Sequence, residues 1–240
     1  MTSRFSSPLL VSLTDPDEPE LDVLVLPGAG TGPSAFSPWC GVVPPTWRIT
    51  SICLPGRGAR IGQPFPTDLH ECADLVAEAA ANELRAPLAL FGHSMGGLLA
   101  LEVALRIPVH ALTMAGTSMA VRTLFAEDLP ESTVRGTLQQ LLRAAGVEDS
   151  PLQQELIDVA APVLRADMLM LRRYEPTEKQ VDCDIVAYYG VDDLVKPMSW
   201  QPYTTGRATE VVYEGDHHAI QTDARWFVED LARRLSTAAR

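Results

Sequence analysis

Positively charged residues are scarce in this chain of 240 residues. Lysine and arginine together number 19, against 31 aspartates and glutamates, which leaves a formal net charge of −12. So acidic a chain repels nucleic-acid phosphates and anionic membrane surfaces at long range, so neither is an expected partner. Hydrophobic residues make up 46% of the chain. That content and length predict one domain with a sizeable core.

Long hydrophobic runs are also missing. No stretch approaches the about 18 consecutive apolar residues of a membrane-spanning helix, and the first eight residues lack the apolar segment of a secretory signal. The four cysteines are widely spaced, with no CxxC motif and no clustering with histidine, which argues against a zinc site. We therefore expect a cytoplasmic protein with reduced thiols and no bound metal.

Internal repeats and low-complexity tracts are absent too, and short apolar runs instead alternate with helical patterns. The helical patterns cover Leu69–Leu84, Leu98–Leu105 and Trp226–Leu235. This alternation predicts an α/β fold with a mostly parallel, doubly wound sheet, preceded by an arm over residues 1–20 that contributes one edge strand. The predicted buried strands are Leu21–Leu26, Ile49–Leu54, Leu88–Phe91, Ala111–Met114, Ile185–Tyr189 and Thr209–Tyr213.

About seventy residues without a strand pattern separate the fourth and fifth of these predicted strands. Amphipathic helical spacing recurs there, and prolines and glycines punctuate it. A structureless loop of this length is uncommon in a compact domain. We therefore expect a helical lid subdomain over residues 118–181, inserted in a single domain over residues 1–240 and covering the active site.

The sharpest motif is Gly92-His93-Ser94-Met95-Gly96-Gly97, between a predicted strand and an apolar helix. Such a GxSxG turn exposes a serine hydroxyl on a strained strand-to-helix turn, as in the α/β-hydrolase fold. The glycines let the backbone pass closely without a Cβ clash. We therefore predict that Ser94 is a nucleophile.

Two later loops offer partners for this serine. His217 follows the last predicted strand and precedes the last helix, which is the place of the general base in this fold. His218 is its less favoured neighbour. After the fifth strand, Asp192 and Asp193 compete for the place of the acid, and position alone does not choose between them.

A glycine-rich loop, Pro27-Gly28-Ala29-Gly30-Thr31-Gly32, follows the first buried strand. It fits neither the dinucleotide fingerprint nor the Walker loop. We expect the backbone N–H of Ala29 to join that of Met95 in an oxyanion hole, where one donor is typically worth about 3 kcal/mol of transition-state stabilisation.

Taken together, these motifs resemble the type II thioesterases, stand-alone hydrolases associated with polyketide and nonribosomal peptide synthases. The more specific features are Leu54-Pro-Gly-Arg-Gly-Ala-Arg60 and Leu164-Arg-Ala-Asp167. The resemblance implies hydrolysis of acyl groups from the phosphopantetheine thiol of acyl or peptidyl carrier proteins. The triad mechanism itself requires no cofactor, and we expect a monomer. It also assigns Asp193 as the triad acid, because the acid of related enzymes stands three residues after a glycine such as Gly190.

The resemblance bears on substrate contacts as well. Related sequences carry a bulky residue at the position of Gly28, which makes Gly28 a candidate substrate-binding position. Arg57 and Arg60 have two interpretations: they tie down loop carbonyls, or they meet the acidic carrier protein or its phosphate through the bidentate guanidinium. Two other functions remain open, a carboxylesterase or lactonase acting on small esters, and a binding module without catalysis.

Overall fold

The computed structural model describes residues 5–85, 87–120, 129–144, 147 and 149–238. Within them lies a seven-stranded sheet in the order β1-β3-β2-β4-β5-β6-β7, in which only the edge strand β1 is antiparallel to its neighbour. The predicted doubly wound sheet and its edge strand are confirmed. The strands are β1 (Leu10–Ser12), β2 (Leu21–Leu26), β3 (Trp47–Ile52), β4 (Leu88–His93), β5 (Ala111–Ala115), β6 (Asp184–Gly190) and β7 (Ala208–Tyr213).

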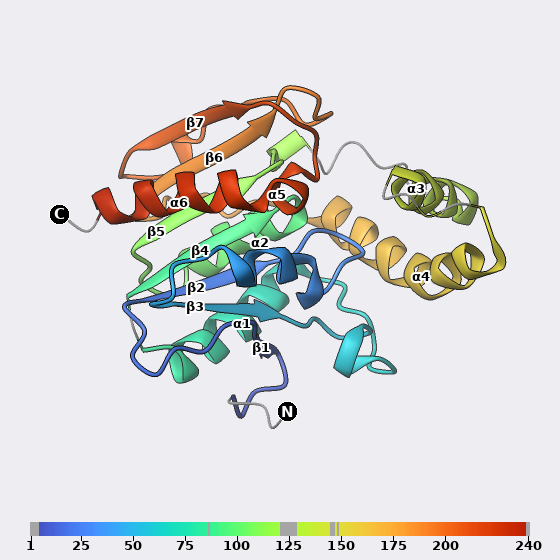
Figure 1. The fold of residues 1–240 in the computed structure, drawn as a ribbon, viewed down its shortest axis with the longest axis horizontal. Coiled ribbons are helices and arrows are strands. Elements are labelled where there is room, and N and C mark those ends of the chain that lie inside the picture. Colours follow the sequence, from blue (N-terminus) through green and yellow to red (C-terminus); the bar gives the residue numbers. More distant parts are fainter. Residues whose placement is uncertain (1–4, 86, 121–128, 145–146, 148, 239–240) are drawn as a thin grey trace.

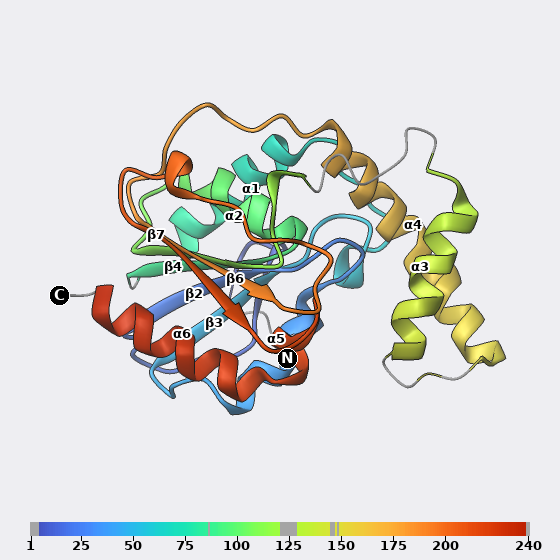
Figure 2. The same ribbon diagram turned by 90° about the horizontal axis from the view of Figure 1, so that it is seen from above.

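Helices cover both faces of this sheet (Figures 1 and 2). One face carries α1 (Leu69–Glu83) and α2 (Met95–Ala104), and the other carries α5 (Ala219–Thr222), α6 (Ala224–Ala238) and the 3₁₀ segment η1 (Pro33–Gly41). Alternate residues of β2 supply the two cores, since Leu24 and Leu26 join the cluster with α1 and α2, whereas Val23 and Val25 join the cluster with α6. This double burial explains why the strands read as unbroken apolar runs.

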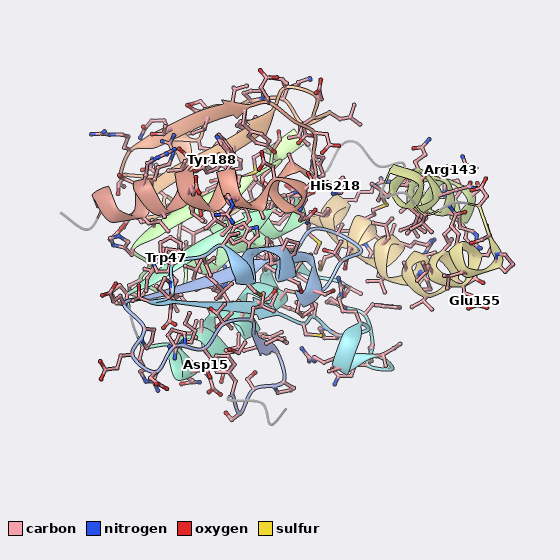
Figure 3. The ribbon with its side chains drawn as sticks, in the orientation of Figure 1. Asp15, Trp47, Arg143, Glu155, Tyr188 and His218 are labelled. Carbon is pink, nitrogen blue, oxygen red and sulfur yellow. The ribbon has the colours of Figure 1, made fainter. Side chains whose placement is uncertain are left out.

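Between β5 and β6 the chain forms a helical hairpin of α3 (Glu131–Ala144) and α4 (Pro151–Arg173). The hairpin stands beyond the carboxyl ends of the parallel strands (Figures 1 and 2), and Arg143 and Glu155 lie towards its far tip (Figure 3). Of the predicted lid over 118–181, residues 121–128, 145–146 and 148 lie outside the described residues. Helices are present in the described part of this region, and α4 continues through Pro162 without a break.

The hairpin has a core of its own and is also anchored to the main body. Val134 and Leu138 of α3 pack with Ile157 and Leu164 of α4. The last turns of α4 instead contribute Met170, Leu171 and the following Tyr174 to the core beneath α1 and α2. The carboxyl-terminal part of α4 is therefore part of the main body. No helix among the described residues is both long enough and apolar enough to cross a bilayer.

Candidate active site

Ser94 lies on the turn between β4 and α2. Its backbone has φ +55° and ψ −117°, a strained combination for a residue with a Cβ. A Cβ at Gly92 would lie 2.2 Å from the carbonyl oxygen of Gly96, and a Cβ at Gly96 would lie 1.9 Å from that of Leu26. Both positions therefore require glycine. The motif forms the tight turn that its pattern predicts, and Ser94 is partly exposed on it.

His217 and Asp193 form a hydrogen-bonded pair on the loops that follow β7 and β6. Nδ1 of His217 lies 2.8 Å from Oδ2 of Asp193. The second carboxylate oxygen, Oδ1, accepts a hydrogen bond of 2.8 Å from the backbone N–H of Val195. Asp193 is only 2% exposed, whereas Asp192 is exposed. The geometry therefore distinguishes the two neighbouring aspartates, because it is Asp193 that contacts the imidazole.

The surroundings of Asp193 favour its ionised form. Burial by itself raises the pKa of this carboxyl, but the hydrogen bond and charge of His217 and the Val195 N–H outweigh it, so the pKa lies below its ordinary value. An ionised Asp193 accepts the hydrogen from Nδ1 of His217. This leaves the other ring nitrogen, Nε2, free to accept a proton.

His93 and Gly116 both lie against His217. Nε2 of His93 lies 2.8 Å from the carbonyl oxygen of His217, and the two rings have centroids 4.6 Å apart. Burial, together with His217 and His218, lowers the pKa of His93 to about 3, so His93 is neutral at pH 7. Gly116 has φ +57°, and a Cβ there would lie 2.8 Å from Nδ1 of His217. Sequence reasoning missed both supports.

Ser94 and His217 are not yet hydrogen-bonded. In the part of the chain that the structure describes, no hydrogen bond joins Oγ of Ser94 to the His217 ring. This contact is often long in hydrolases without substrate and tightens when substrate binds. His218, the less favoured alternative, is the N-cap residue of α5 and lies at the end of the body that faces the hairpin (Figure 3).

Two backbone amides lie near this turn. Met95 is the first residue of α2, so its N–H has no partner within the helix. Ala29 follows β2, and a Cβ at the preceding Gly28 would lie 3.4 Å from Cβ of Ser94. Among the described residues, neither the Ala29 N–H nor the Met95 N–H donates a hydrogen bond to the backbone. The two amides are therefore candidate donors to an oxyanion, and Gly28 lies beside Ser94.

The two arginines of the Pro-Gly-Arg segment differ in their surroundings. Arg57 is buried and donates to both carboxylate oxygens of Asp167 and to the carbonyl of Thr31. Because these contacts lie inside the protein, they favour a structural role for Arg57 over a contact with the carrier protein. Arg60 is half-buried and donates to Gln63 and to the carbonyl of Cys53.

The candidate site thus offers a hydroxyl, an imidazole paired with a carboxylate, and two backbone amides. Within the described ranges, no group of three or more His, Cys, Asp or Glu side chains is arranged to hold a metal ion. The set can perform nucleophilic acyl transfer assisted by general acid–base catalysis.

Comparison with known proteins identifies the family. A family model described as "Thioesterase domain" matches residues 22–238. The chain belongs to the thioesterase family. This thioesterase is 28% identical over 229 residues to the gramicidin S biosynthesis protein GrsT of Aneurinibacillus migulanus, which covers 90% of this chain and 89% of that protein. It is 26% identical to the medium-chain S-acyl fatty acid synthase thioesterase of Rattus norvegicus, covering 87% and 85% of the two chains.

Solved structures agree with this assignment. RedJ, a thioesterase from the prodiginine pathway of Streptomyces coelicolor, is 28% identical, with a TM-score of 0.75 over 94% of this chain and 92% of its own. BorB, a type II thioesterase from the borrelidin cluster, shares the fold of this thioesterase with a TM-score of 0.82, at 24% identity and coverage of 96% and 98%. The predicted α/β-hydrolase fold and the resemblance to type II thioesterases are confirmed, and the thioesterase is a hydrolase.

Proposed function

We propose that this thioesterase hydrolyses acyl groups from the phosphopantetheine thiol of acyl or peptidyl carrier proteins, in a polyketide or nonribosomal peptide pathway, with Ser94, His217 and Asp193 as its catalytic triad. The observation that carries the triad is the 2.8 Å contact between His217 Nδ1 and buried Asp193 at the same sheet edge as the strained Ser94 turn. The biosynthetic setting is supported by the relatives, which act in gramicidin S biosynthesis and as a fatty acid synthase thioesterase.

The reaction begins at Ser94. Its Oγ attacks the thioester carbonyl carbon while Nε2 of His217 accepts the hydroxyl proton. The amides of Ala29 and Met95 stabilise the negative charge that develops on the carbonyl oxygen. The carbon–sulfur bond then breaks, the proton on His217 passes to the leaving thiolate, and the acyl group stays on Ser94 as an ester.

Hydrolysis of that ester completes the cycle. Water replaces the departed thiol, and His217 accepts its proton as the oxygen attacks the ester carbon. The second tetrahedral intermediate then collapses, His217 returns that proton to the departing Oγ of Ser94, and the acyl group leaves as a carboxylic acid. Throughout, the Asp193 carboxylate keeps the imidazole in the required tautomer and stabilises the imidazolium. Every proton moves between Ser94, His217, the thiol and water, so the cycle balances without a cofactor.

Three features of the chain are candidates for contact with the carrier-bound substrate. Arg60 remains a candidate contact for an acidic carrier protein, Gly28 a candidate acyl contact beside Ser94, and the α3/α4 hairpin a candidate lid. Arg57 is better explained by its buried contacts. A monomer in the cytoplasm remains our expectation.

Labelling with a fluorophosphonate tests the nucleophile. The wild type is expected to gain one phosphonyl group by intact mass, and Ser94→Ala none, while circular dichroism of the two proteins is the same. Both proteins are then tested on an acyl carrier protein and on p-nitrophenyl esters. Turnover of small esters with no turnover of the carrier substrate would favour a carboxylesterase, and label on Ser94→Ala would contradict the triad.

A further inference from the structure

We propose that Asp167 and Arg57 are positioning residues for the oxyanion hole, so that helix α4 of the hairpin aims the backbone amide of Ala29. The inference rests on the proposed function, because it assumes that Ala29 binds the oxyanion. It concerns a buried ion pair outside the catalytic triad, joining three segments that are far apart in the sequence.

The first step is the orientation of the Gly28–Ala29 peptide. The carbonyl oxygen of Gly28 accepts hydrogen bonds from the Thr31 N–H at 3.2 Å and from Thr31 Oγ1 at 2.8 Å. The described residues contain no cis peptide bond, so the Gly28–Ala29 bond is trans, and in a trans peptide the N–H points away from the carbonyl oxygen of the same unit. With the Gly28 carbonyl turned towards Thr31, the Ala29 N–H is therefore turned away from the loop interior.

The second step fixes the loop on the other side of Ala29. The Gly30 N–H donates a 2.8 Å hydrogen bond to Oδ2 of Asp167, and the Thr31 carbonyl accepts a 3.0 Å hydrogen bond from Arg57. Arg57 also donates to Oδ2 and Oδ1 of Asp167 at 2.7 and 2.6 Å. The peptide units before and after Ala29 are thus both held, one by Thr31 and the other by Asp167.

The third step is the close contact of α4 with this loop. Leu164 lies three residues before Asp167, on the same helical face. A Cβ at Gly30, where φ is +76°, would lie 3.0 Å from Cβ of Leu164. Glycine at position 30 therefore allows α4 to lie directly on the loop. Ala29 itself packs against the hydrophobic cluster of the hairpin.

The main effect of the Arg57–Asp167 ion pair is on the position of the loop rather than on the stability of the fold. Asp167 is fully buried and Arg57 is 7% exposed. A buried ion pair contributes little net stability, because desolvation of the two charges offsets much of their attraction. Replacing both residues with apolar ones of similar volume is therefore tolerated by many folds. What such a replacement removes here is the acceptor for the Gly30 N–H and the donor to Thr31.

The test uses the full chain in two forms: Asp167→Asn, and the double variant Arg57→Met with Asp167→Leu, which keeps an apolar contact between α4 and the loop. Both are assayed with a short acyl thioester of N-acetylcysteamine, and their affinity for an alkyl boronic acid is measured. The boronate forms a tetrahedral adduct on Ser94 and reports on the oxyanion hole. Loss of a whole oxyanion donor costs about 10²- to 10³-fold, so misplacement of one is expected to cost about 10- to 100-fold.

We expect the double variant to lose about 10- to 100-fold in kcat and a similar factor in boronate affinity, with KM changed less than about threefold. Asp167→Asn, which keeps one oxygen for Gly30, is expected to lose less. The matched control is Asp22→Asn, because Asp22 makes an equally buried bidentate pair with Arg48 on β2 and β3. The control is expected to lower thermal stability while kcat and boronate affinity stay within about twofold of wild type.

A double variant that melts cooperatively and keeps wild-type kcat and boronate affinity would overturn the positioning role. So would an equal loss in the Asp22→Asn control, since that would reflect loss of folded protein. The assay needs no carrier protein. If the wild type hydrolyses the short thioester but no carrier-bound acyl group, the proposed substrate is wrong and the positioning role remains testable.

Discussion

Replacing Asp193 with asparagine exchanges one carboxylate oxygen for an NH₂ group, and it tests whether Asp193 is the acid of the triad. In the folded protein, Oδ1 of Asp193 accepts from the Val195 N–H and Oδ2 contacts Nδ1 of His217. An asparagine that keeps the Val195 hydrogen bond presents its NH₂ group to His217. Nδ1 must then accept, so the ring hydrogen moves to Nε2, and Nε2 can no longer take the proton of Ser94.

The expected loss follows from this change of tautomer. The same substitution in a Ser-His-Asp protease lowers kcat by about 10⁴-fold, which corresponds to about 5.4 kcal/mol at 1.36 kcal/mol per factor of ten. We expect a similar loss for Asp193→Asn, with little change in stability because the Val195 contact is kept. Asp192 is exposed, so Asp192→Asn is expected to cost less than about tenfold.

The assay is single-turnover hydrolysis of a short acyl thioester, which separates chemistry from product release. Thermal melts of both variants provide the control for folding. If Asp192→Asn shows the large loss and Asp193→Asn does not, the acid is the neighbouring residue and the geometric argument fails.

Three further predictions use other features of the structure. Gly116→Ala is expected to lower kcat at least about tenfold in single turnover, because its Cβ would lie 2.8 Å from the His217 ring; unchanged kcat would show that the ring has room to move. Burial raises the pKa of Glu102, but hydrogen bonds from Arg106, Thr177 and Tyr174 lower it by a larger amount. The pKa of Glu102 therefore lies below its ordinary value. Ionised Glu102 therefore stabilises the fold above the unfolded-state pKa, and that stability is lost as pH falls through the lower folded-state value. Glu102→Gln should thus destabilise the protein in urea titrations at pH 7, and the effect should shrink progressively as the pH falls below about 4.3, the ordinary glutamate pKa; an effect that stays constant as the pH falls would contradict this. In amide exchange, α3 is expected to exchange faster than β4, while the last turns of α4 stay protected by the main core; equal protection of α3 and β4 would argue against a mobile lid.

Much of the fold could be predicted because its strands are buried on both faces. Leu21–Leu26 has the predicted limits, and the other strands differ by one or two residues. The β3 prediction, Ile49–Leu54, is shifted because Trp47 and Arg48 pair with β2, while Cys53 instead donates to the carbonyl of Leu9. Pairing of this kind depends on partners elsewhere in the chain.

The site was predictable where chain order determines position. Ser94, Asp193 and His217 each follow a parallel strand. Their meeting at the carboxyl ends of the strands therefore follows from the topology. The supports of the site were not predictable in this way. His93, Gly116 and the Arg57–Asp167 pair act through contacts across the molecule. The Leu164–Asp167 segment was visible as a motif, but nothing in its spacing pointed to Gly30.

The central claim is that this thioesterase acts on acyl groups carried by phosphopantetheine. The most direct measurement compares kcat/KM for an acyl group on holo acyl carrier protein with that for the same acyl group on N-acetylcysteamine. Binding energy from the remote carrier should appear in the rate, so we expect kcat/KM to be about 10²-fold or more higher for the carrier-bound acyl group. Ser94→Ala is expected to abolish turnover of both substrates. Equal kcat/KM for the two substrates would contradict the claim and favour an esterase of small soluble substrates.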